Sequence, residues 1–482
     1  MLFNSLIFLI FFPVVFILYW VLPHRFRKYF LLAASYYFYM CWKPEFIVLV
    51  LFSTAANYLC SLGMERSPAK RKVLLAVSLV INLGMLFFFK YFNFFSESLT
   101  AVCRAVSIPF SAPILRIVLP VGISFYTFQV MSYTIDVYRG KMKAERDFVL
   151  FALFVSYFPQ LVAGPIEKAG NLLPQLKSPH AFQYGQASHG ARLMAWGFFK
   201  KCVAAAYFAK LADAVYNNVS GATGGAAMVA TAAFALQIYC DFGGYSDIAR
   251  GCSEMMGIEL MVNFKVPYLA VSMRDFWRRW HISLTGWFRE YVYIPLGGSR
   301  RGLARTLGNT WVVFAVSGLW HGANWTFVVW GLLHALYLSG GLLLQKLRKN
   351  GEKRAHTAWY TGLMRLKVFA LACIAWIFFR ADTLSDAVSV LGTMAAGLAH
   401  PGAYVRDAAE LLTAEGAAVT AFTALSVAVL FCVDLLDERA DIMDGIGKLR
   451  PAVRYGLYVI FLAAMLLLIP KTAAAPFIYF QF

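Results

Sequence analysis

Charged residues are scarce in this chain of 482 residues: Asp, Glu, Lys and Arg make up 14% of it, against about 25% in soluble domains. Hydrophobic residues make up 60%, more than a water-soluble protein of this length can bury. A cytosolic enzyme, a disordered protein and a secreted disulfide scaffold are therefore excluded. The apolar runs continue over roughly 15–22 residues and do not alternate as barrel strands do, which leaves an all-α polytopic membrane protein.

Recognisable metal and cofactor motifs are absent as well. The eight cysteines form no CxxC pair and lie mostly within apolar runs. The chain carries no zinc, P-loop, Rossmann or Ser-His-Asp signature. We therefore expect the cysteines to be small buried residues, and we expect no metal site and no bound cofactor.

Acidic residues are few, 25 against 44 basic ones, so the net charge is +19. In a soluble protein this excess would suggest a nucleic-acid partner. Here the basic residues lie between apolar runs, as the positive-inside rule predicts for cytoplasmic loops. We expect membrane lipids and no nucleic acid as partners. The rule places 274–305 and 346–367 in the cytoplasm and the acidic loop 381–416 outside.

The apolar runs predict the spans, and about twelve of them would occupy half of the chain. No internal repeat or low-complexity linker is evident, which predicts a single membrane domain over residues 1–482. The run 148–164 is short and broken by Pro159 and Gly164, so we expect it to be re-entrant or tilted. The other runs lie near 3–22, 29–42, 45–63, 73–95, 117–137, 190–216, 226–242, 311–345 (long enough for two spans), 364–380, 417–436 and 452–470.

Polar residues inside apolar spans are costly, which makes them functional candidates. His321 lies roughly ten residues into the run that starts at Trp311, about half way through a bilayer. Gly318 and Gly322 flank it and would let a substrate approach the imidazole, which can take a proton from a hydroxyl. The alternative is a core histidine bonded to a neighbouring helix. His334 does not share the face of His321, and we interpret it as structural.

A second candidate region is 273–295, where Arg, Trp and Tyr alternate at helical spacing. This pattern is typical of a helix at the membrane–water interface, with Trp277 at headgroup level and arginines reaching into water. On such a helix His281 shares the face of Trp277 and Arg278. An anchoring helix without a catalytic role is the alternative.

The third candidate region is QIYCDFGGYSD, residues 237–247. Gly243 and Gly244 are expected to break the helix while Asp241 and Asp247 enter a segment at membrane depth. Irregular backbone at that depth is tolerated within protein or beside a water-filled cavity. The alternative is a helix break whose acids pair with nearby arginines. These three regions alone indicate a membrane enzyme or transporter with a buried histidine.

Longer motifs together resemble the membrane-bound O-acyltransferase family along the whole chain. The resemblance is strongest to the bacterial branch that O-acetylates alginate or peptidoglycan or transfers D-alanine to teichoic acid. The motifs are PQLVAGPI at 159–166, DFGGYSD at 241–247, FWRRWHISL at 276–284, LWHGAN at 319–324 and FIYFQF at 477–482.

The resemblance implies a ring of about eleven or twelve transmembrane helices, with re-entrant and interfacial helices, around a central funnel. It implies a catalytic His321 and a second motif histidine, His281, which would hold either an oxyanion or the acceptor. We expect His281 to matter less for proton transfer. The funnel is expected to be narrowest at His321, with Gly318 and Gly322 on its wall. Asp241, Ser246 and Asn324 would line a wet path.

The family chemistry moves an acyl group from a cytoplasmic thioester to a hydroxyl reached from outside. Acetyl-CoA or an acyl-carrier thioester would be the donor substrate, and an exported SGNH-hydrolase-like acyltransferase the partner. The location would be the bacterial inner membrane. The candidate donor-binding residues are Trp277, Arg278, Arg279 and Asn324.

The favoured function is O-acetylation of a cell-envelope or exported polysaccharide. D-alanyl transfer to teichoic acid is the alternative within the family. A transporter or flippase with an intramembrane proton relay is the alternative of another class, but it predicts inverted repeats, and none is evident. A structural scaffold of an export complex would tolerate the loss of His321.

Overall fold

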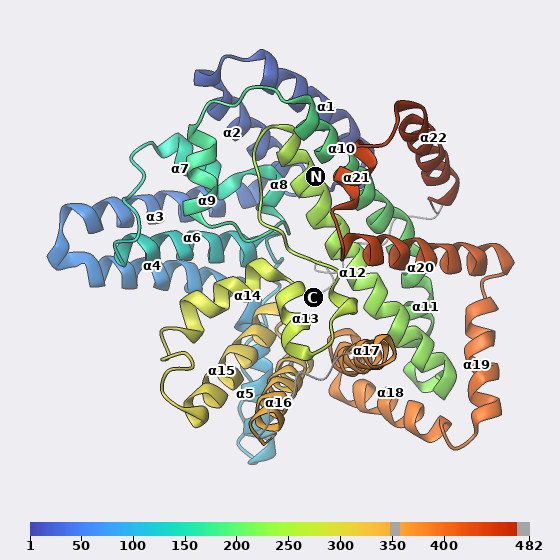
Figure 1. Ribbon diagram of the computed structural model, residues 1–482. Helices are drawn as coiled ribbons and strands as arrows, with labels where there is room; N and C mark the ends of the chain where they lie inside the picture. Colours follow the sequence, from blue (N-terminus) through green and yellow to red (C-terminus); the bar gives the residue numbers. More distant parts are fainter. Residues whose placement is uncertain (348–356, 470–482) are drawn as a thin grey trace. The chain divides into compact units, whose positions relative to one another are not determined.

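The computed structural model describes residues 1–347 and 357–469, and within them the chain forms helices and no β-strand (Figure 1). This confirms the all-α membrane class. Among the described residues, seven helical segments are long and apolar enough to cross a membrane. This is fewer than the eleven or twelve expected, because several predicted runs form helices that are shorter or more polar. The seven are Pro44–Arg66, Pro68–Ala105, Gly224–Met255, Trp325–Leu347, Ala358–Arg380, Ala417–Asp437 and Pro451–Leu468.

The chain groups into two compact units. The first contains Met1–Met194 and Ile248–Met261, and the second contains Ala195–Asp247 and the described residues from Val262 onward. Helix α12 (Gly224–Met255) contributes residues to both. A single membrane domain over 1–482 stays a prediction. The candidate catalytic and donor-binding residues all belong to the second unit.

In the first unit, buried polar side chains join α3, α4 and α6, which lie side by side (Figure 1). The Asn57 carbonyl accepts hydrogen bonds from Ser78 (2.5 Å) and Asn82 (2.9 Å), and Thr134 adds a longer one. These groups satisfy one another inside an apolar bundle. The helices are α1 Leu6–Val21, α2 His24–Met40, α3 Ile47–Arg66, α4 Arg71–Leu86, α5 Phe92–Ala105, α6 Ile123–Tyr138, α7 Phe148–Ser156, α8 Phe158–Leu161, α9 Ala169–Lys177 and most of α10 Tyr184–Phe198, with the π-helix η3 Phe87–Tyr91. The end of α10, from Ala195, belongs to the second unit.

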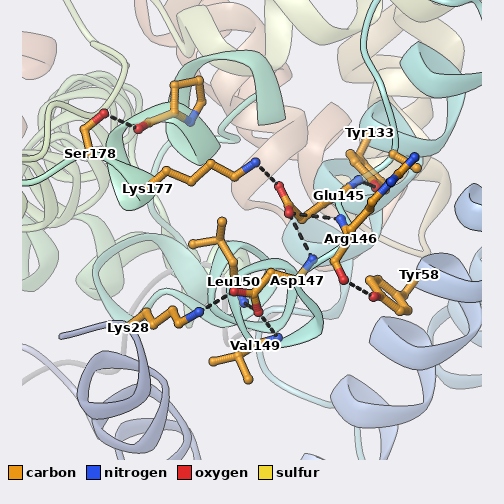
Figure 2. A network of polar contacts seen from close by, with 12 residues as sticks. Lys28, Tyr58, Tyr133, Glu145, Arg146, Asp147, Val149, Leu150, Lys177 and Ser178 are labelled. Carbon is orange, nitrogen blue, oxygen red and sulfur yellow. Dashed lines mark hydrogen bonds and ion pairs between the residues drawn. The ribbon is translucent and has the colours of Figure 1, made fainter. Parts of the chain in front are cut away.

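Two acids fix the start of the broken run 148–164 (Figure 2). Asp147 caps α7 by accepting two backbone N–H groups of its first turn, and it forms an ion pair with Lys28 of α2. The buried Glu145 pairs with Lys177 of α9 at 2.5 Å. The run then breaks at Tyr157 between α7 and α8, so the predicted interruption is confirmed. The nine residues of α7 cover only about 14 Å, too short for a span.

The second unit is built from the remaining helices. They are the π-helix η4 Phe199–Ala204, α11 Ala205–Tyr216, α12, the short η6 Pro267–Leu269, α13 Met273–Arg279, α14 Ile282–Phe288, the π-helix η7 Arg289–Tyr293, α15 Leu303–His321, α16 Trp325–Leu347, α17 Ala358–Arg380, α18 Leu384–Gly397, α19 Pro401–Thr413, α20 Ala417–Asp437, α21 Ile442–Gly447 and α22 Pro451–Leu468. The run 311–345 thus forms two helices, α15 and α16. The region 381–416, which we expected to be a loop, is largely helical.

The prediction of one continuous interface helix over 273–295 is wrong, because the region forms separate helical segments. Helix α13 ends at Arg279, Trp280 is extended, and His281 has a left-handed backbone before α14 begins. His281 therefore does not share a helix face with Trp277 and Arg278.

The expected break in α12 is also wrong, because this helix runs unbroken through Gly243 and Gly244. A Cβ at Gly244 would lie 2.7 Å from the carbonyl oxygen of Gly197 and 2.9 Å from the backbone nitrogen of Lys201. The glycine allows two backbones to approach closely, as small residues do between membrane helices.

Helices α15 and α16 pack against each other through glycines. A Cβ at Gly318 would overlap the carbonyl oxygen of Phe327, and one at Gly331 would overlap that of Phe314. At Gly322 the ring of Phe327 already fills the space. Gly318 and Gly322 therefore face α16, and the expectation that they leave room for a substrate on a funnel wall is wrong.

This packing predicts that Gly318→Ala lowers the melting temperature of the purified protein, because the added methyl group forces α15 away from α16 at a cost of about 1–3 kcal/mol. Gly308→Ala is the matched control on the same helix, since a Cβ there meets nothing within 4 Å. It should leave the melting temperature unchanged or raise it. Equal melting temperatures for the two variants would contradict this account.

Candidate active site

The two predicted catalytic histidines lie next to each other in the second unit. The ring centroids of His281 and His321 are 6.3 Å apart, and the ring planes are inclined by 60°. His281 is completely buried and His321 is 4% exposed. The structure thus brings together side chains from two separate motifs.

His321 is the last residue of α15, and aromatic rings surround it. Trp330 of α16 and Phe379 of α17 meet its ring edge-on, with centroids 4.8 Å and 5.4 Å away. The C-terminal end of a helix carries partial negative charge. A positive charge on the imidazole at this position would therefore be favoured over one at the other end of the helix.

His281 stands at a sharp turn between α13 and α14. Its backbone has φ +43°, and Val266 in the preceding segment has φ +42°. Non-glycine residues rarely adopt this conformation, β-branched ones least of all. Such strain persists where surrounding contacts hold it, and it clusters at functional sites. His281 lies outside the seven candidate spans, and burial lowers the pKa of its imidazole to about 3, so the ring is neutral.

Asn263 holds this turn, and it is a residue that the sequence did not single out. Its backbone oxygen accepts the N–H of Ile282 at 2.9 Å. Its side-chain Oδ1 lies 3.0 Å from Nδ1 of His281 and accepts the hydroxyl of Ser283 at 2.9 Å. Its Nδ2 donates to Ser246 of α12 at 3.2 Å. A buried asparagine thereby links α12 to the first turn of α14.

The only signal for Asn263 in the sequence is a polar side chain between Val262 and Phe264, shortly before the FWRRWHISL motif. A single asparagine in a connecting segment is common. It became informative only when the structure placed it against His281.

Two buried ion pairs lie beside the site on α12. Lys201 pairs with Asp241, and Lys200 pairs with Asp247. Phe242, next to Asp241, meets the ring of His281 edge-on at 4.7 Å. Both carboxylates thus have lysine partners on η4. The wet path along Asp241, Ser246 and Asn324 stays a prediction.

His334 packs as a core histidine. It is completely buried, and its Nδ1 accepts the indole N–H of Trp277 at 3.3 Å. Its ring also meets Trp330, with centroids 4.9 Å apart. This supports its structural interpretation. Trp277 itself is 8% exposed and belongs to this aromatic core, not to a headgroup layer.

The other candidate donor-binding residues are spread out. Arg279 forms ion pairs with Asp275 and Glu438. Arg278 is exposed and makes no hydrogen bond or ion pair within the part of the chain that the structure describes. Asn324 donates to the backbone oxygen of Asp382 and accepts the N–H at the second position of α16. Their roles in donor binding stay predictions. The FIYFQF motif at 477–482 lies outside the described residues.

Comparisons with known proteins match the part of the chain that contains these residues. The model of the membrane-bound O-acyltransferase family matches residues 144–380, which include both histidines and Asn263. The chain is 39% identical over 405 residues to a probable alginate O-acetylase AlgI of Pseudomonas putida, covering 82% of this chain and 80% of that one. It is 33% identical to a peptidoglycan O-acetyltransferase of Helicobacter pylori over the same shares of the two chains.

A teichoic acid D-alanyltransferase of Bacillus subtilis is more distant, with 25% identity over 54% of this chain and 68% of its own. The similarity to the two O-acetylating proteins extends over most of both chains. With the helical membrane architecture and the paired histidines, it shows that the chain is an acyltransferase of the membrane-bound O-acyltransferase family.

Proposed function

We propose that this enzyme takes an acetyl group from a cytoplasmic thioester and passes it across the membrane for O-acetylation of a cell-envelope or exported polysaccharide. The adjacent buried imidazoles of His281 and His321 carry the proposal, because acyl transfer to a hydroxyl needs a base that takes its proton. The similarity to proteins named for alginate and peptidoglycan O-acetylation supports acetyl as the transferred group.

In the proposed reaction, His321 takes the proton of the acceptor hydroxyl while the hydroxyl oxygen attacks the thioester carbonyl. The tetrahedral intermediate then collapses, the C–S bond breaks, and the proton passes from His321 to the leaving thiolate. The end of α15 stabilises the transient imidazolium. The aromatic rings of Trp330 and Phe379 keep bulk water from competing for the acyl group.

Acetyl-CoA or an acyl-carrier thioester is the proposed donor, because both are made in the cytoplasm and both carry phosphate that exposed arginines such as Arg278 attract. The proposed partner outside is an SGNH-hydrolase-like acyltransferase. The proposed location is the inner membrane of a bacterium. D-alanyl transfer to teichoic acid is the second candidate, with weaker similarity behind it. The family assignment removes the support for a transporter.

We predict that His321→Ala reduces acetyl transfer at least about 100-fold, because a positioned general base contributes a factor of that size. The measurement is thiol release from acetyl-CoA by membranes or purified protein, together with acetylation of the polymer in cells. Transfer within a few-fold of wild type would show that His321 is not the base. A parallel assay with a D-alanyl carrier thioester separates the two candidate donors.

His334→Gln is the matched control. Like His321, His334 is buried and contacts Trp330, but its contacts are those of a core residue. The substitution should lower the melting temperature and keep most of the activity per folded molecule. If both variants lost activity equally, the loss in His321→Ala would reflect disturbed packing.

The location of the donor predicts the membrane topology. In a background without the exposed Cys41 and Cys432, a cysteine at the exposed Ser299 should react with a permeant maleimide but not with an impermeant one in intact cells. A cysteine at the exposed Ala414, between α19 and α20, should react with both reagents. Labelling of Ser299→Cys by the impermeant reagent would show that residue 299 lies outside. The predicted topology would then be inverted, and the region expected to bind the cytoplasmic donor would face the wrong side of the membrane.

A further inference from the structure

We infer that Asn263 is a positioning residue that fixes the tautomer of His281, with the hydrogen on Nδ1 and the lone pair on Nε2. His281 then accepts a hydrogen bond from a hydroxyl of the acceptor substrate and does not donate one to an oxyanion. The nature of that substrate rests on the proposed function, whereas the tautomer follows from the local contacts alone.

The hydrogen-bond partners of Asn263 fix the orientation of its side-chain amide. The backbone N–H of Ser283 points at one end of the amide at 3.4 Å, and the Ser283 hydroxyl lies 2.9 Å from the same atom. A backbone N–H can only donate, so this atom is the carbonyl oxygen Oδ1. The other end, Nδ2, meets the hydroxyl oxygen of Ser246, which accepts.

The tautomer of His281 follows from this orientation. Its Nδ1 lies 3.0 Å from Oδ1 of Asn263, and two atoms at that distance form a hydrogen bond only if Nδ1 carries the hydrogen. The fully buried imidazole is neutral and therefore has a single N–H. Nε2 is left with a lone pair, and no described residue lies within hydrogen-bonding distance of it.

An unsatisfied buried acceptor costs free energy, so it calls for an explanation. A substrate hydroxyl is the explanation that the neighbourhood favours, because the ring of His321, the proposed base, is 6.3 Å away. An oxyanion needs hydrogen-bond donors. The lone pair of an unprotonated Nε2 would repel an oxyanion, so the oxyanion must be held by other groups. This decides between the two roles that the sequence left open for His281.

No charged side chain interferes with this arrangement among the described contacts of His281. The titratable group packed against it is His321, and the carboxylates of neighbouring α12 are held by lysines. The contacting side chains are Phe242 from α12, Asn263 and Phe264 from the preceding segment, and Trp320 and His321 from α15.

The tautomer can be measured directly on the unmodified chain. In protein labelled with ¹⁵N-histidine and reconstituted in lipid, the nitrogen signals that disappear in His281→Gln belong to this ring. We expect a protonated Nδ1 and an unprotonated Nε2. The opposite pattern, or a doubly protonated ring at neutral pH, would overturn the inference. Because this readout needs no turnover, a failure of wild-type protein to transfer acetyl groups would contradict the proposed function alone.

Two substitutions at Asn263 test the effect on transfer. Asn263→Leu removes the acceptor at Nδ1 and should lower kcat at least about 10-fold, the range for loss of an orienting partner, with a smaller change in KM. Asn263→Asp keeps the acceptor and should restore most of kcat at high pH. Its carboxylate stabilises the protonated imidazole. A protonated Nε2 cannot accept a hydrogen bond, so the acid limb of the rate profile should move to higher pH.

Asn309→Leu is the control for loss of a buried asparagine. Asn309 is 4% exposed and donates to the backbone oxygens of Leu296 and Gly298, and within the described residues it forms no hydrogen bond with His281 or His321. This variant should be less stable and keep the wild-type pH profile. Wild-type kcat in Asn263→Leu, or equal loss in folded Asn263→Leu and Asn263→Asp without a shifted acid limb, would show that Asn263 does not set the state of His281.

Discussion

Polar groups buried in an apolar bundle must find their partners inside the protein, because lipid offers no hydrogen bonds. This constraint organises both units. In the first, Asn57 collects hydrogen bonds from α4 and α6, and two acids hold the start of α7. In the second, the lysines of η4 neutralise the carboxylates of α12. These partners join elements far apart in the chain, so satisfying them also fixes the helix arrangement within each unit.

At the active site, Nε2 of His281 is buried without a hydrogen-bond partner among the described residues. Asn263 is satisfied at both ends of its amide and at its backbone oxygen, and it holds His281 in a strained left-handed turn. The strain is maintained by these contacts, since nothing in the local sequence favours it. The result is a rigid imidazole that presents one unused acceptor. Preorganised polar groups of this kind need not reorient during the reaction.

The parts of the structure set by local residue types could be predicted from the sequence. Long apolar runs became α3, α16 and α17, and the broken run became α7 and α8. The turn at His281 could not be predicted, because Trp280 and His281 carry no helix-breaking signal and the turn depends on Asn263. At Gly243 and Gly244 of α12 the sequence predicted a helix break that the structure does not have. Glycine pairs often mark breaks, but Gly244 serves close packing against Gly197, which only the tertiary structure shows.

The pairing of the two histidines was predicted by the motif resemblance and not by spacing, and this points to how the site is built. His321 is fixed by the glycine-packed pair α15 and α16, and His281 by Asn263, so the two imidazoles are placed by backbones that leave little freedom. In the proposed mechanism, such a site activates a hydroxyl whatever acyl group arrives. Selection between acetyl and D-alanyl donors must then come from residues along the donor's approach, outside the histidine pair. This fits the similarity of the chain to relatives named for either transfer.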